Sequence, residues 1–82
     1  RVRFENSIMK DVILTGSDFS KSSCIYFDYA DLSKAYIDGV NFTGAEFYGA
    51  KLNEAYYDSK TKWSNGKSIP SSIIKKYKMK KK

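Results

Sequence analysis

A chain of 82 residues allows a single domain with a small core, and its 41% hydrophobic content contains no apolar run of about 18 residues, so no membrane-spanning helix is predicted. One cysteine and no histidine exclude an internal disulfide and leave carboxylates as the main metal ligands, so neither a metal site nor a cofactor is predicted. The net charge of +6 divides unequally, because residues 1–59 carry six basic and nine acidic side chains, a net −3, whereas residues 60–82 carry nine lysines and no acid.

Residues 2–24 contain two series of residues spaced five positions apart. The large members are predicted to face a core: Phe4, Met9, Leu14, Phe19 and Cys24. The small members are Val2, Ser7, Val12, Ser17 and Ser22. A period of five fits neither a helix, in which such positions rotate by about 140° at each step, nor a strand, in which they change face. It fits a chain that turns a corner after each repeat, so that four repeats close a square coil of about 20 residues with both series inside.

Residues 30–59 repeat the same pattern six times without interruption. Each repeat begins with Ala or Val, and its third residue is large: Leu32, Ile37, Phe42, Phe47, Leu52 and Tyr57. The registers of the two halves differ by three residues, and the break is expected between Cys24 and Leu32. Either three residues bulge out of the coil there or one face is two residues short, and the sequence leaves both alternatives open.

The second half resembles the pentapeptide-repeat family, whose pattern is A-(D/N)-L-x-x. The run Ala30-Asp31-Leu32 matches this pattern completely, and residues 40–42 match it with conservative changes. Residues 55–63 also resemble the way in which members of the family close their last coil. The resemblance covers roughly residues 2–59. It implies an all-β solenoid, a right-handed quadrilateral β-helix of about three coils, and a role in protein binding.

Neither the cysteine nor the outward acids predict catalysis. We expect Cys24 to be a small buried residue, because a reactive thiol needs an exposed, basic setting that its neighbours do not supply. The acids are expected to form a solvated wall instead of a pair for acid–base chemistry: Asp31, Asp38, Glu46, Glu54 and Asp58. The sequence therefore predicts no enzyme.

Outward tyrosines are candidates for an interface, because tyrosine offers contact area at low entropic cost. The candidates are Tyr26, Tyr29, Tyr36, Tyr48 and Tyr56. The alternative is that they stack between coils, since Tyr36 and Tyr56 are 20 positions apart. That spacing also predicts Asp31 over Lys51.

The C-terminal region is predicted to cover the last coil. Residues 60–68 would form a closing loop, residues 69–79 a short capping helix, and residues 80–82 a basic tail. Ser68 would cap the helix and Pro70 would lie in its first turn. The apolar face of the helix would lie over Trp63, and its members are Ile69, Ile73, Ile74 and Tyr77.

The tail lysines predict an anionic contact, with a disordered solubilising tail as the alternative. They are Lys75, Lys76, Lys78, Lys80, Lys81 and Lys82. The contact is expected for those on the helix, and disorder for residues 80–82. Nucleic acid phosphates, an acidic membrane surface and an acidic protein are the candidate partners.

These features together predict a non-catalytic protein-binding or scaffold module, a small accessory subunit of a larger assembly. The resemblance to the pentapeptide-repeat family implies the setting, a photosynthetic or otherwise organellar assembly in a plastid or a bacterium. Protein partners are expected at the N-terminal end of the solenoid, which has no predicted cover, and along the tyrosine-bearing wall. The resemblance to the family also implies one alternative, a DNA-mimicking inhibitor of DNA gyrase, although the body carries a charge of only −3. The other is binding of phosphate backbones through the lysine-rich tail, which would depend steeply on salt.

Overall fold

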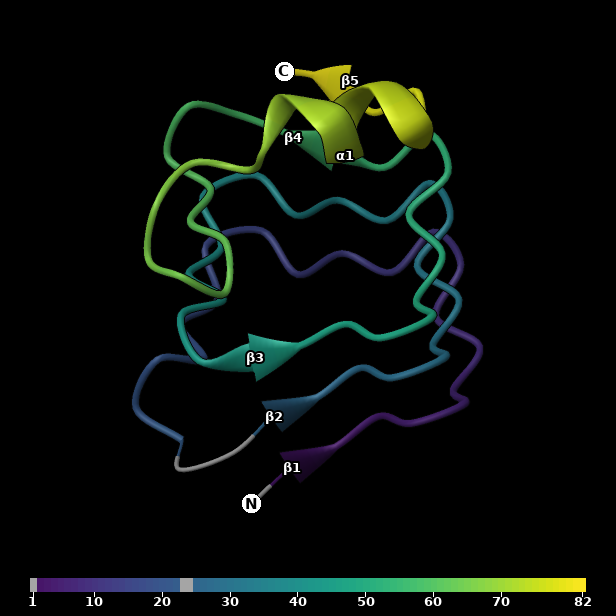
Figure 1. The fold of residues 1–82 in the computed structure, drawn as a ribbon, viewed down its shortest axis with the longest axis vertical. Coiled ribbons are helices and arrows are strands. Elements are labelled where there is room, and N and C mark those ends of the chain that lie inside the picture. Colours follow the sequence, from purple (N-terminus) through teal and green to yellow (C-terminus); the bar gives the residue numbers. More distant parts are fainter. Residues whose placement is uncertain (1, 23–24) are drawn as a thin grey trace.

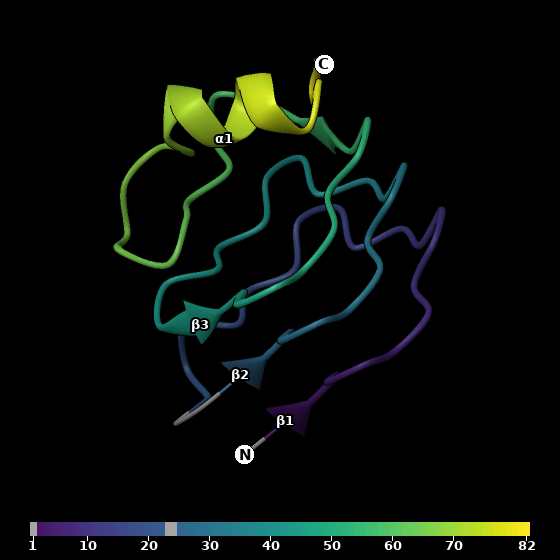
Figure 2. The same cartoon turned by 45° about the vertical axis from the view of Figure 1, so that its right-hand side comes forward.

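The computed structural model describes residues 2–22 and 25–82, which wind into a right-handed β-helix of three stacked coils with a helix across one end (Figures 1 and 2). Strands β1 (Val2–Arg3), β2 (Ile25–Tyr26) and β3 (Ala45–Glu46) form a parallel sheet in that order. Strand β4 (Tyr56–Tyr57) pairs in parallel with β5 (Lys80–Lys81), which follows helix α1 (Ser71–Lys76). No helix in the described part of the chain is long and apolar enough to cross a membrane.

Each coil has four faces, and one large residue of each face points inward. Numbered in chain order, the faces carry these inward residues: Phe4, Phe27 and Phe47 on the first; Met9, Leu32 and Leu52 on the second; Leu14, Ile37 and Tyr57 on the third; Phe19, Phe42 and Trp63 on the fourth. We call residues 2–22 coil 1, residues 25–44 coil 2, and residues 45–64 coil 3.

The pairing between coils locates the break in register. Asp18 pairs with Asn41, 23 positions on, and β1 pairs with β2 at the same offset. Tyr36 pairs with Tyr56, 20 positions on, as β2 does with β3. Three extra residues therefore lie between Asp18 and Ile25, so an insertion is present and no face is short. The break comes earlier than the sequence predicts.

The shifted break corrects the list of core residues. Phe27 is 0% exposed and fills the first face of coil 2, but the predicted core omits it. Cys24, which was assigned to that core, lies outside the described residues. The predicted residues of coil 1 are only half-buried, because coil 2 covers them from one side: Phe4, Met9, Leu14 and Phe19. Phe47 and Tyr57 are also half-buried, whereas Leu32, Ile37, Phe42 and Leu52 are fully enclosed.

Stacked aromatic rings run through the coils along the first face. Phe27 stacks on Phe4 with ring centroids 5.1 Å apart and on Phe47 at 5.2 Å. Phe47 then stacks on Trp63 at 4.2 Å, with the two ring planes 10° apart. Each such pair adds about 0.5–1.5 kcal/mol to the burial of the rings themselves. The column therefore joins the first faces of all three coils to Trp63 on the fourth face of coil 3.

An acidic or amide residue before the inward residue makes a hydrogen bond within its own face. Asp31 Oδ1 accepts the backbone N–H of Ser33 at 3.0 Å and its hydroxyl at 2.6 Å. Asn41 Oδ1 accepts the same two groups of Thr43 at 3.0 and 2.6 Å. These backbone N–H groups donate to no carbonyl of a neighbouring coil. The Asp or Asn side chain at the second position of the repeat thus accepts a backbone N–H that has no hydrogen-bond partner in the neighbouring coil.

Residues 69–82, which we call the lid, differ from the prediction in three respects. Helix α1 is shorter than residues 69–79, its N-cap residue is Pro70, and Ser68 does not cap it. Residues 80–82 are not a free tail, because the N–H of Lys80 donates to Ala55 O at 2.8 Å and that of Lys82 to Tyr57 O at 2.7 Å. Strand β5 therefore pairs the edge that coil 3 would otherwise expose.

The apolar side chains of the lid turn toward the stack. Ile69 and Met79 are buried, at 6% and 8% exposure, and both belong to the core. Ile73, Ile74 and Tyr77 pack against the same core, to which Trp63 also belongs, as the helical spacing predicts. Met79 is an additional anchor that the predicted apolar face does not include.

Candidate functional surfaces

The five candidate tyrosines form two pairs and one separate residue. Tyr36 and Tyr56 stack on the third face, with ring centroids 4.5 Å apart and ring planes 8° apart. Tyr29 and Tyr48 form an edge-to-face pair at 5.5 Å at the corner that follows the first face. Tyr26 is half-buried on the first face, with the guanidinium of Arg3 5.1 Å from its ring centroid. The five tyrosines therefore do not form one continuous surface.

The Tyr36–Tyr56 stack is held between lysines of the lid. The ammonium groups of Lys82 and Lys80 lie 5.5 and 5.9 Å from the ring centroids of Tyr36 and Tyr56. Cation–π contacts of this kind contribute about 0.5–1 kcal/mol at exposed sites. This pair stabilises the third face, and its rings are engaged within the chain.

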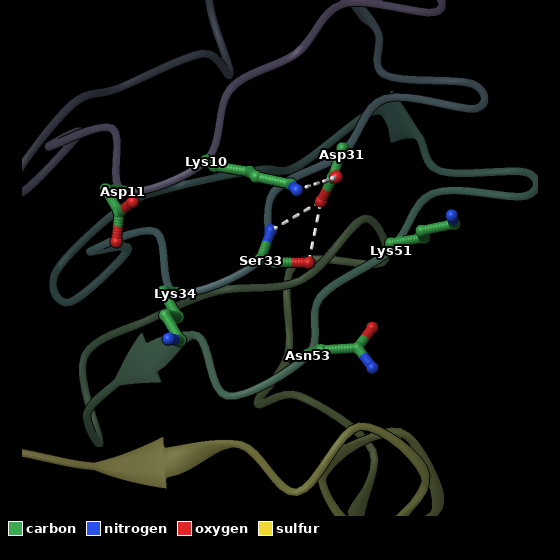
Figure 3. Close-up of a pocket in the computed structure, with 7 residues that line it drawn as sticks. All are labelled: Lys10, Asp11, Asp31, Ser33, Lys34, Lys51 and Asn53. Carbon is green, nitrogen blue, oxygen red and sulfur yellow. Dashed lines mark hydrogen bonds and ion pairs between the residues drawn. The ribbon is translucent and has the colours of Figure 1, made fainter.

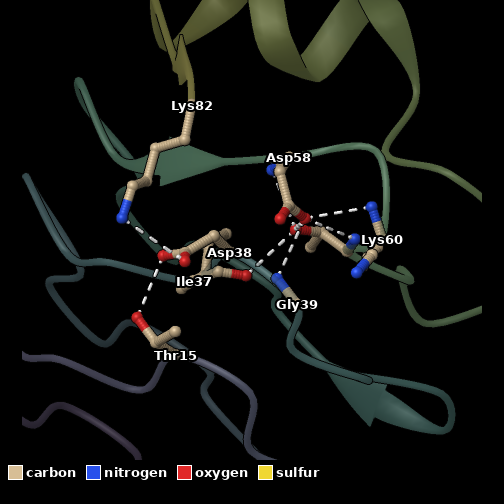
Figure 4. A network of polar contacts seen from close by, with 8 residues as sticks. Thr15, Ile37, Asp38, Gly39, Asp58, Lys60 and Lys82 are labelled. Atoms are coloured by element: carbon tan, nitrogen blue, oxygen red, sulfur yellow. Dashed lines mark hydrogen bonds and ion pairs between the residues drawn. The ribbon is translucent and has the colours of Figure 1, made fainter.

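Asp38 links the lid to both lower coils (Figure 4). Its Oδ2 lies 3.5 Å from Lys82 Nζ, and its Oδ1 accepts the hydroxyl of Thr15 at 3.0 Å. The residue is 8% exposed and is therefore almost enclosed. Asp38 is thus a structural acid that joins coil 1, coil 2 and the C-terminal residue, and it does not face solvent as part of an acidic wall.

Asp58 organises the turn that closes coil 3 (Figure 4). Its Oδ1 accepts the backbone N–H groups of Gly39 at 2.9 Å, Lys60 at 3.0 Å and Thr61 at 3.1 Å. These bonds hold the pKa of Asp58 below its ordinary value, the one from Gly39 contributing most. This turn accommodates one extra residue, since Asn41 pairs with Lys62, 21 positions on.

A polar pocket of about 380 Å³ lies on the second face (Figure 3). Its lining residues are Lys10, Asp11, Asp31, Ser33, Lys34, Lys51 and Asn53. Lys10 Nζ lies 3.7 Å from Asp31 Oδ2. The side-chain hydrogen bond from Ser33 lowers the pKa of Asp31, so its carboxylate stays ionised and is a poor proton acceptor at neutral pH. As predicted from the sequence, Asp31 pairs with Lys51 in the next coil.

Metal ligands do not gather anywhere in the described part of the chain. No group of three or more His, Cys, Asp or Glu residues there is placed to hold an ion. Three of the five candidate acids, Asp31, Asp38 and Asp58, are engaged by backbone amides, hydroxyls or lysines and therefore make structural contacts.

Among the described residues, the large exposed hydrophobic side chains lie on the body of the solenoid, distributed over several faces. In coil 1, Val2, Ile8 and Ile13 are 37%, 83% and 72% exposed. Tyr29 and Tyr48 are 57% and 73% exposed, and no large hydrophobic residue of the lid is comparably exposed. The sequence analysis missed Ile8 and Ile13, although both stand immediately before an inward residue, where coil 2 carries Asp31 and Tyr36.

The edge of coil 1 also presents unpaired backbone groups. The N–H groups of Ile8, Ile13 and Asp18 donate to no acceptor among the described residues. The equivalent N–H groups in coil 2 donate to carbonyls of coil 1, for example that of Asp31 to Ser7 O at 2.9 Å. Exposed apolar side chains and free amides therefore coincide at this end.

The comparisons with known proteins agree with this geometry. Residues 25–56 match the family model for pentapeptide repeats, in eight copies. None of the curated proteins matches the chain. The crystal structure of alr5209, a pentapeptide repeat protein from Nostoc Pcc 7120, superposes with a TM-score of 0.55 at 20% sequence identity, over 98% of this chain and 84% of that one. Residues 25–56 thus match pentapeptide repeats, and the chain shares its fold with a pentapeptide repeat protein.

Proposed function

We propose that this chain is a non-catalytic protein-binding module, an accessory component of a larger assembly, which holds its partner on the body of the solenoid. Pentapeptide-repeat proteins are generally non-enzymatic. The observation that carries the proposal is that the large exposed hydrophobic residues of the described chain lie on the body, in coil 1 and at the Tyr29–Tyr48 corner, and not on the lid.

The Tyr29–Tyr48 corner is suited to bind protein. Its two rings are held edge to face, so little side-chain entropy remains to be lost on binding. Gly49 allows this arrangement, because a Cβ at that position would lie 2.6 Å from the ring of Tyr29. The corner thus presents a preformed aromatic contact.

The edge of coil 1 is the second surface in the proposal. A partner segment that follows the second and third faces of coil 1 would accept the free N–H groups of Ile8 and Ile13, one on each face, and its side chains would cover the two exposed isoleucines. Addition of a strand to a sheet edge takes its affinity from main-chain hydrogen bonds and its specificity from side-chain contacts.

Site-specific photocrosslinking in cells of the source organism tests the proposal. A benzophenone amino acid replaces Tyr48 in one variant, Ile13 in a second, and Ser72 on α1 in a control; all three residues are exposed. Discrete protein adducts from positions 48 and 13, and none from position 72, are expected. Absence of adducts at both body positions, or the same adducts from all three, would contradict the proposal.

Gyrase inhibition by mimicry of DNA has less support. It requires a strongly negative rod, whereas the body carries −3 over residues 1–59 and the lid end is positive. A supercoiling assay with purified gyrase tests it, and inhibition at micromolar concentrations would favour this alternative over the protein-binding module.

A further inference from the structure

The lid end of the solenoid carries a concentration of positive charge that the proposed protein-binding surfaces do not use. We define the lysine lid as the six exposed lysines of α1, of the turn that follows it, and of the C-terminal segment with β5: Lys75, Lys76, Lys78, Lys80, Lys81 and Lys82. Among the described residues, only Lys82 of this set has a carboxylate within ion-pair distance. Within the same part of the chain, the other five ammonium groups have no acid partner, although those of Lys76 and Lys80 lie 5.2 and 5.9 Å from the ring centroids of Tyr77 and Tyr56.

The lysine lid is carried by elements that lie together, because α1 and β5 lie across the same end of the stack (Figures 1 and 2). Of its six ammonium groups, that of Lys82 is turned toward Asp38 and Tyr36 of coil 2. The apolar residues between the lysines are directed inward, with Ile69 and Met79 buried in the core. The aromatic residue of the lid, Tyr77, is also engaged, since its hydroxyl donates to Ala50 O at 3.0 Å. The outer surface therefore presents ammonium groups without a large exposed apolar side chain.

This composition favours phosphate over protein or lipid as the ligand. Protein interfaces are depleted in lysine and enriched in aromatic residues and arginine, which is the reverse of the lid. No exposed apolar group is available to enter a bilayer, and no exposed ring is available to stack on unpaired bases. Lysine binds phosphate oxygens as a point charge, without the geometry that reads base edges.

We propose that the lysine lid binds the phosphate backbone of duplex nucleic acid without sequence preference. The distribution of charge supports this orientation, because residues 1–59 are net negative and would be repelled by phosphates, whereas residues 60–82 hold nine lysines. Binding through the lid leaves the Tyr29–Tyr48 corner and the edge of coil 1 accessible to protein.

Fluorescence anisotropy of a labelled DNA duplex of about 20 base pairs tests the proposal. About four phosphate contacts predict a slope near −3.6 in log affinity against log salt, so that raising salt from about 50 to about 200 mM lowers affinity by roughly 10²-fold. Lys75→Gln, Lys76→Gln and Lys78→Gln combined should weaken binding by at least about tenfold and flatten the slope by about one for each contact removed.

The matched control removes the same charge from the body, by Lys21→Gln, Lys34→Gln and Lys51→Gln, which are also exposed lysines. It should keep the affinity within about threefold of wild type, since only the long-range field changes. If the lid variant does not fold, Lys80→Gln with Lys81→Gln replaces it, because side-chain changes retain the backbone pairing of β5. Absence of binding at low salt, an equal loss in the control, or tighter binding to phosphatidylserine vesicles than to the duplex would each overturn the proposal.

Discussion

Truncation of Phe27 should be the most destabilising single change in this chain. The ring is 0% exposed and stacks between Phe4 and Phe47, with centroids 5.1 and 5.2 Å away. Phe19 and Phe42 contact it edge to face at 5.7 and 5.6 Å. Phe27→Ala therefore leaves a cavity bordered by aromatic rings of all three coils, which cannot collapse without moving the coils relative to one another.

The expected loss is about 3–5 kcal/mol in the free energy of unfolding, as for buried phenylalanines generally. A domain of this size has a total stability of about 4–12 kcal/mol, and each kilocalorie per mole corresponds to about 4–8 °C in melting temperature. The Phe27→Ala protein should accordingly melt at least about 12 °C below wild type, or be unfolded at room temperature.

Two probes follow the same transition. Trp63, the single tryptophan, stacks on Phe47 at 4.2 Å and reports coil 3 by its fluorescence, while circular dichroism reports all coils. Tyr48→Ala removes an aromatic ring that is 73% exposed and should lower stability by no more than about 1.5 kcal/mol, the upper range for the edge-to-face pair with Tyr29 that is lost. A Phe27→Ala protein that melts within a few degrees of wild type would refute the assigned register.

Three further predictions concern the turns and the lid. Gly49→Ala should destabilise the fold by about 1–2 kcal/mol because Gly49 has φ +69°. The loss should exceed that of Gly44→Ala, since only at Gly49 would the added Cβ meet the ring of Tyr29. Equal losses for the two variants in melting experiments would contradict that contact. Backbone N–H groups hold the pKa of Asp58 below its unfolded value, so its contribution to the free energy of unfolding is present above the unfolded pKa of about 3.9 and is lost as pH falls through the folded pKa. Denaturant titrations across this acid range should show a smaller loss of stability for Asp58→Ala than for wild type. Identical pH profiles of the two proteins would refute the assignment. Deletion of residues 80–82 should lower the free energy of unfolding by about 1–3 kcal/mol, because two backbone hydrogen bonds of β5 are lost; an unchanged melting temperature would show that β5 does not pair with β4.

The five-residue period was sufficient to predict the fold class. Two inward residues in every five cannot form one face of a helix or a strand, and the small residue of each pair leaves room for the coil to turn its corner. This local spacing predicts the burial of four core residues, Leu32, Ile37, Phe42 and Leu52. So does the stacking of Tyr36 on Tyr56, because identical positions in successive coils are superposed.

What the sequence could not decide depends on how the coils align with one another. An insertion between coils changes no local pattern that reveals its position, so the break was placed too late and Phe27 was omitted from the core. Residues 80–82 have the composition of a free tail, and only the unpaired edge of coil 3 makes them a strand. The exposure of Ile8 and Ile13 likewise follows from their place in coil 1. The repeat is a local property that sequence carries directly, whereas register, edge pairing and exposure arise from contacts between residues distant along the chain.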